Sequence, residues 1–127
     1  MKVTVLSALT FAVVLQGCTE SNNDQIRKFV PGIYVRHFRD EFSTGSDTLD
    51  ITEHDGKAGI YFIDEKEGYQ QKLDGKVFPA QYKTKEHTAL FNETTHQLTI
   101  QNGGDIITFL PDKNKLLLGR TEYEKVK

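Results

Sequence analysis

The sequence predicts an all-β fold built as an antiparallel meander of seven or eight strands. Apolar and polar residues alternate with a period of two in several segments, most clearly over residues 48–52. Two strong turn signals separate such segments: the pair Asp74 and Gly75, and the run of Asn and two Gly at residues 102–104. No segment keeps the apolar period of an amphipathic helix for three turns.

The first strand is expected to begin at residues 33–35, directly after a Pro-Gly breaker pair. Tyr34, Phe38 and Phe42 recur every four residues, which fits either a helical turn or a strand with a bulge. We favour a strand, because nothing extends the helical period beyond two turns.

The middle of the chain contributes three features. Residues 48–52 alternate as a half-buried strand does, and residues 60–63 are apolar on both faces, which is typical of a central strand. A charged segment, residues 64–68, is expected to follow that strand. The Asp74-Gly75 pair then predicts a hairpin, because a type I′ turn needs positive φ at both central positions.

The second half continues the pattern. We expect strands at residues 88–91, at residues 98–100 with Leu98 and Ile100 pointing inward, and at residues 106–110. The last strand is expected to run from about residue 115 to residue 123.

A meander of this length must close or cover its edges. We therefore expect a small lipocalin-like barrel or a strongly curved sheet, with a β-sandwich as the alternative architecture. Five large apolar side chains are expected to fill so small a barrel: Phe38, Phe62, Phe91, Phe109 and Leu117.

The N-terminal segment has the features of a targeting signal. Residues 3–14 are mostly apolar, too short to cross a ~30 Å hydrocarbon core but of the length of a signal-peptide apolar region. It is followed directly by Leu15, Gln16, Gly17 and Cys18, and Cys18 is the one cysteine of the chain.

A Leu three residues before a Cys, with a Gly between, resembles the lipobox of bacterial lipoproteins. That resemblance implies cleavage before Cys18, a diacylglycerol on its thiol, and anchoring to a membrane of the bacterial envelope, the outer membrane by preference. The domain is then expected in the periplasm or at the cell surface. The predicted organisation is a signal peptide at residues 1–17, a lipidated flexible tether at residues 18–28 and a single β domain at residues 29–127.

Composition excludes one class of partner. Cleavage removes only Lys2 among the charged residues, so 15 basic and 18 acidic side chains remain. Together with a sequence pI of about 6.1, this excess of acid argues against nucleic-acid binding.

Residue types that carry out chemistry form no recognisable pattern. The histidines are dispersed at positions 37, 54, 87 and 96, without metal-ligand spacing, and no nucleophile elbow or phosphate loop is present. We therefore expect no catalytic residues, no metal and no cofactor, and the chain is predicted not to be an enzyme. Asp47, Thr48 and Leu49 resemble the Asp-Thr-apolar sequon of O-glycosylation in Bacteroidetes, which would place a glycan on Thr48.

Several pieces of the mature chain also resemble a set of small lipoproteins of Bacteroidetes, some of which are found with conjugative-transposon genes. These pieces are residues 29–35, 47–49, 107–111 and 114–119, with Tyr123 and Lys125. The resemblance implies a shared fold and location. Two functions are then expected to compete: an accessory or protein-interaction module with an envelope partner, and a lipocalin-like carrier of a small apolar ligand.

Overall fold

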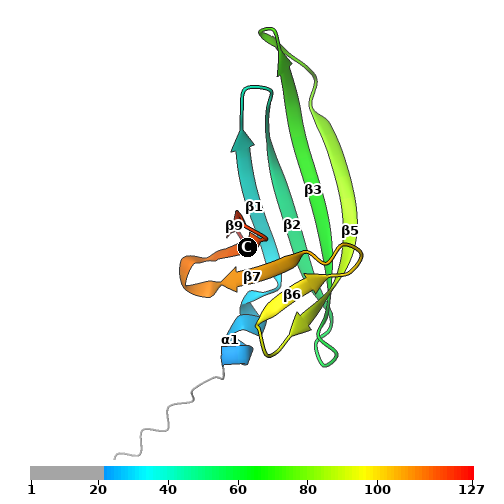
Figure 1. Cartoon of the computed structure of the whole chain (residues 1–127), viewed down its shortest axis with the longest axis vertical. Helices are drawn as coiled ribbons and strands as arrows, with labels where there is room; N and C mark the ends of the chain where they lie inside the picture. Colours follow the sequence, from blue (N-terminus) through cyan, green and yellow to red (C-terminus); the bar gives the residue numbers. More distant parts are fainter. Residues whose placement is uncertain (1–21) are drawn as a thin grey trace, which may run out of the picture.

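The structure is a computed structural model that describes residues 22–127. It shows one short helix and a single antiparallel sheet that closes on itself as a small lipocalin-like barrel, which confirms the predicted all-β meander (Figure 1). The elements are α1 (Asn22–Phe29), β1 (Gly32–Arg39), β2 (Ser43–Asp55), β3 (Ile60–Leu73), β4 (Lys76–Val77), β5 (Gln81–Asn92), β6 (Gln97–Ile100), β7 (Ile106–Leu110), η1 (Pro111–Lys113), β8 (Lys115–Leu118) and β9 (Thr121–Lys125).

Strands that follow one another in the sequence are neighbours in the barrel. The ring runs β1, β2, β3, β5, β6, β7, β8, β9 and returns to β1. The closing pair, β1 with β9, is short and joins Tyr34 to Lys125 and Val35 to Glu124. The two-residue strand β4 pairs only with the end of β3 and takes no part in the ring.

The strands differ greatly in length. β2, β3 and β5 have 13, 14 and 12 residues, whereas β6 to β9 have four or five each. The long strands and the end of β1 therefore extend well beyond the ring (Figure 1). We call this extension the projecting sheet; it comprises residues 36–39, 43–48, 64–73 and 81–88.

Two predicted strand boundaries are wrong. The charged segment at residues 64–68 belongs to β3. It tolerates charge because both of its faces reach solvent in the projecting sheet. The single last strand predicted for residues 115–123 is in fact the hairpin of β8 and β9, turned at Gly119 with a φ of 60°. A lone glycine between two short apolar and charged runs gave too weak a turn signal.

The predicted turns are confirmed. Asp74 and Gly75 have φ values of 49° and 75°, and Asn102, Gly103 and Gly104 also have positive φ. These left-handed conformations are the ones that Asp, Asn and Gly adopt at least cost.

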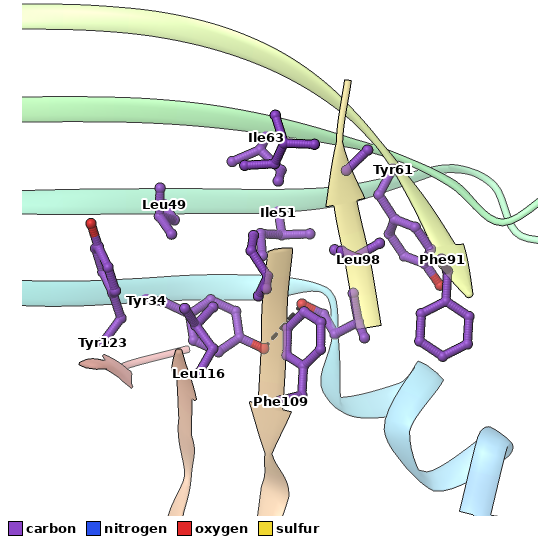
Figure 2. Packing of buried hydrophobic residues seen from close by; sticks show 14 residues of the cluster. Tyr34, Leu49, Ile51, Tyr61, Ile63, Phe91, Leu98, Phe109, Leu116 and Tyr123 are labelled. Carbon is purple, nitrogen blue, oxygen red and sulfur yellow. Dashed lines mark hydrogen bonds between the residues drawn. The ribbon is translucent and has the colours of Figure 1, made fainter. Parts of the chain in front are cut away.

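Alternate side chains from all eight ring strands fill the barrel (Figure 2). Leu98 and Ile100 point inward as predicted, and Phe91 and Phe109 are buried. Phe38 and Leu117 are only partly buried, and Phe62 is 41% exposed, so the expectation that these three fill the interior is wrong. Phe62 falls on the outer face by strand parity, where its ring stacks on His54 at 4.3 Å. The core consists of Val30, Tyr34, Leu49, Ile51, Tyr61, Ile63, Ala89, Phe91, Leu98, Ile100, Ile107, Phe109, Leu116 and Tyr123.

The helix α1 corrects the predicted tether. Residues 22–28 were expected to be flexible but lie in α1, while residues 18–21 fall outside the described residues. Ile26 and Phe29 are three positions apart, so they share one helix face, and both pack against the barrel core. The residues around Ile26 are polar, and Phe29 is predicted as the first residue of the β domain. The sequence therefore does not predict that these two side chains form one apolar helix face.

Candidate functional site

The predicted lipid site lies outside the described residues. Leu15, Gln16, Gly17 and Cys18 all precede Asn22, where the structure begins. Their role stays a prediction. In the sequence, Cys18 lies four positions before Asn22, where α1 begins.

Thr48 lies at the middle of β2, where it pairs with Val35 of β1 and Lys66 of β3. Its side chain is half-buried on the outer face. The backbone of Thr48 is paired on both sides. A glycan would therefore have to be added to a residue in the middle of a sheet, or to the chain before it folds. O-glycosylation of Thr48 stays a prediction.

Polar contacts fix α1 to one end of the barrel. Arg27 donates to the carbonyl of Gly56 at 3.1 Å, forms an ion pair with Glu93, and lies 5.4 Å from the centre of the Phe91 ring. The buried Tyr34 hydroxyl donates to the carbonyl oxygen of Phe29 at 2.7 Å. This end of the barrel, which also holds the β2–β3 turn, is therefore closed by the helix.

A buried carboxyl lies where the barrel gives way to the projecting sheet. Asp47 is 7% exposed, and the Tyr123 hydroxyl donates to its Oδ2 at 2.6 Å, while its Oδ1 has no partner among the described residues. Burial raises the pKa of Asp47, the Tyr123 hydrogen bond lowers it, and Glu65 and Glu67 raise it further. Burial raises the pKa of Tyr123 as well.

The inner face of the projecting sheet is charged. Strand registers place Arg36, Asp47, Glu67 and Lys83 in one row across four strands. Beside this row, Nε2 of His87 lies 2.9 Å from Oε2 of Glu65. The two signs of charge are mixed, so this face offers no single-sign field for an ion.

The far end of the projecting sheet is apolar. Phe42, in the β1–β2 turn, is 65% exposed, and Val77 of β4 is 61% exposed. Three further large side chains near this end are exposed, namely Leu73, Phe78 and Tyr82. We call these five residues the apolar tip. A backbone hydrogen bond joins the β1–β2 turn to the end of β3, since the N–H of Lys72 donates to the carbonyl of Phe42 at 2.7 Å.

Residue types able to do chemistry remain apart. Within residues 22–127, no three His, Cys, Asp or Glu side chains gather in a way that could hold a metal ion. Asp64 and Glu65 are adjacent in β3 and so point to opposite faces. Asp40 accepts hydrogen bonds from the backbone N–H groups of Phe42 and Ser43, which lower its pKa, and acts as a turn cap.

Hollows lie outside the barrel. One of about 530 Å³ lies beside α1 and the β2–β3 turn, lined by Arg27, residues 53–57 and Tyr61. Two others flank β5 where it leaves the ring, one of about 490 Å³ and one of about 440 Å³. These flanking hollows are lined mainly by strand residues of the outer face and the edge, not by the barrel core.

Sequence reasoning missed the apolar tip and the projecting sheet. The signal that could have found them is the length of the polar run after residues 60–63, which continues to Leu73 without a turn residue pair.

No helix within residues 22–127 is long and apolar enough to cross a membrane. No family model, curated protein or solved structure matches the chain.

Proposed function

We propose that this chain is a bacterial envelope lipoprotein, acylated on Cys18, that acts as a non-catalytic protein-interaction module. The observation that carries this proposal is the projecting sheet with its exposed apolar tip. Monomeric soluble domains seldom leave several large apolar side chains exposed together, and such clusters are typical of contact sites.

The placement of the helix supports this function. Asn22 is four positions after Cys18, so a lipid on Cys18 would keep the start of α1 within about 14 Å of the anchor. β3 starts beside α1 and runs to the tip, and its 14 residues span about 45 Å. The barrel would then lie close to the membrane, for which we favour the outer membrane. The apolar tip, at the opposite end of the molecule, would point away from that membrane (Figure 1).

The competing proposal is a carrier of a small apolar ligand. A lipocalin-like barrel is compatible with it, but here 14 buried side chains occupy the interior. The packed interior therefore supports the interaction module. The resemblance to lipoproteins found with conjugative-transposon genes suggests envelope components of conjugation as the first partners to examine.

Site-specific cross-linking in cells tests the proposal. A photoreactive phenylalanine analogue would replace Val77 in the tip, and the matched control would place it at Lys113, which is exposed in η1 on the barrel. We expect one dominant envelope protein to be cross-linked from position 77 and not from position 113. Equal cross-linking from both positions, or none from position 77, would contradict the proposal.

The membrane anchor has its own test. The full chain is expected to partition into detergent on phase separation, and Cys18→Ser is expected to move it to the aqueous phase and to leave the signal peptide uncleaved. A Cys18→Ser chain that still partitions into detergent at the mature mass would refute acylation at this residue.

A further inference from the structure

The outer edge of β5 has no neighbouring strand where it leaves the barrel. β5 pairs with β3 from Gln81 onward, but its pairing with β6 begins only at Ala89. Residues 81–87 are therefore an edge strand of the projecting sheet, as far as the described chain extends. Residues 81–86 are also exposed.

The direction of the free backbone groups follows from one hydrogen bond. The N–H of Gln101 donates to the carbonyl of Thr88 at 2.8 Å, so the polar groups of Thr88 point away from β3. In a strand, every second residue directs its N–H and C=O to the same side. Tyr82, Thr84 and Glu86 therefore point their N–H and C=O groups outward, and no described residue provides a backbone partner for them.

Open space borders this edge at residues 85–88, next to the barrel. Residues 85–88 line the hollow of about 440 Å³ together with Gln101 and Asn102. Residues 86–88 also line the hollow of about 490 Å³, with Phe62 and Thr52 on the outer face. A strand added at this edge would meet open space at this end, along the edge and on the outer face.

The charges at the edge select the partner. Lys83 and Lys85 point to the inner face beside the edge, and neither forms an ion pair with another described residue. Nζ of Lys83 lies 5.3 Å from the centre of the Tyr69 ring, while the carboxylate of Glu65, opposite Lys85, is held by His87. Opposite charges directly across a strand pair are favourable and like charges are unfavourable.

A second copy of the chain fits this edge poorly. Antiparallel pairing of two β5 edges about Thr84 would set Lys83 of each chain against Lys85 of the other. Lysines on an edge are a common means of preventing such self-pairing. An acidic strand meets the opposite condition, because its carboxylates would lie across from both ammonium groups.

We propose that the edge of β5 at residues 82–86 binds an extended segment of a partner protein as an added strand, with acidic side chains at alternate positions facing Lys83 and Lys85. This mode of recognition takes affinity from backbone hydrogen bonds and specificity from the alternate side chains. The inference rests on the proposed interaction function and names the chemistry of its partner.

Synthetic peptides test this inference with the full chain purified in detergent. The probe is a ten-residue peptide of alternating glutamate and valine with capped ends, labelled for fluorescence anisotropy. The controls are a lysine-valine peptide of the same length and a glutamate-valine peptide methylated on alternate backbone nitrogens. We expect only the unmethylated acidic peptide to bind, and we expect it to slow amide exchange at Tyr82, Thr84 and Glu86.

Variants of the chain provide the matched comparison. Thr84→Pro removes an N–H that makes no bond within the sheet, whereas Thr84→Val keeps it. We expect Thr84→Pro to abolish binding of the acidic peptide and Thr84→Val to keep it. Lys83→Glu with Lys85→Glu should weaken the acidic peptide about tenfold or more and transfer binding to the lysine-valine peptide.

Three results would overturn the inference: equal binding of the acidic and basic peptides, equal binding of the methylated and unmethylated acidic peptides, or self-association of the chain through β5. The methylated peptide decides the question even if Thr84→Pro fails to fold. If the acidic peptide does not bind but position 77 still cross-links to one envelope protein, the edge inference alone is wrong. If the acidic peptide binds but position 77 gives no cross-link, the apolar tip is not the contact site.

Discussion

Tyr123→Phe tests the buried polar contact that joins the barrel to the projecting sheet. The change removes one hydroxyl and keeps the ring, which is only 2% exposed. It also removes the hydrogen bond that reaches Asp47 Oδ2 at 2.6 Å. Since Oδ1 of Asp47 already lacks a partner among the described residues, the whole carboxylate would become unpaired in a buried position.

The expected loss is large for a single oxygen atom. A hydrogen bond to a charged group contributes about 1.5–3 kcal/mol to the free energy of unfolding. Leaving a buried charge unpaired costs at least as much as the lost bond contributed. We expect Tyr123→Phe to lower the free energy of unfolding by about 2–3 kcal/mol at pH 7. Asp47→Ala should cost less, because it removes the buried charge together with the bond.

The loss should depend on pH in a defined direction. Burial raises the pKa of Asp47 in the folded chain above its unfolded value, and the Tyr123 hydrogen bond opposes this. A raised folded pKa means that the contribution of Asp47 to stability is complete below the unfolded pKa, near 4, and is lost as pH rises through the folded pKa. Without Tyr123 the folded pKa rises further, so the difference between Tyr123→Phe and wild type should shrink as pH falls from 7 towards 4.

Urea denaturation followed by circular dichroism measures these quantities in a double-mutant cycle of Tyr123→Phe and Asp47→Ala at pH 7 and pH 4.5. The expected coupling at pH 7 is about 1.5–3 kcal/mol. A coupling below about 0.5 kcal/mol would refute the contact. A coupling that grows towards acid pH would refute the assignment of the buried group as an ionised carboxylate.

Three further predictions follow from the packing. Ile26→Ser should lower the free energy of unfolding by roughly 1–2 kcal/mol in the same urea assay, because it detaches α1 from the core. The control Gln25→Ser, at an exposed neighbouring position, should change it by less than about 0.5 kcal/mol, and equal effects of the two changes would show that α1 does not pack on the barrel. Gly45→Val should destabilise by about 2 kcal/mol or more, because a Cβ at Gly45 would lie 2.1 Å from the carbonyl oxygen of Gly68; thermal melts that match those of the control Ser46→Val would contradict the close approach of β2 and β3. Burial also raises the pKa values of Tyr34 and Tyr123, so the folded state keeps protons that unfolded tyrosines lose near pH 10, and the melting temperature should fall as pH rises above about 10. In the double variant Tyr34→Phe, Tyr123→Phe the melting temperature should fall less over the same pH range. An equal fall in the variant and the wild type would contradict the burial of these two tyrosines.

Local patterns were enough to predict most of the strands and turns. The alternation in residues 48–52 and the Asp74-Gly75 pair report short-range properties, namely which face of a strand is apolar and where positive φ is tolerated. These properties are already present in a few consecutive residues. The order of the strands in the ring followed as well, because hairpins join sequence neighbours. The hairpin at Gly119 was missed because its turn lacks such a pair.

Tertiary structure alone decided three features. Ile26 becomes part of the core only because the barrel end offers it an apolar surface, which no local pattern around it announces. The buried contact of Asp47 with Tyr123 joins residues 76 positions apart, and no local pattern foretells such a distant pair. The free edge of β5 exists because β6 pairs with only four of its residues, Ala89 to Asn92, and that limit depends on the length of a neighbouring strand. The sequence by itself thus determined the all-β class and the turns, whereas which surfaces remain open for a partner depended on how unequal strands meet in the closed ring.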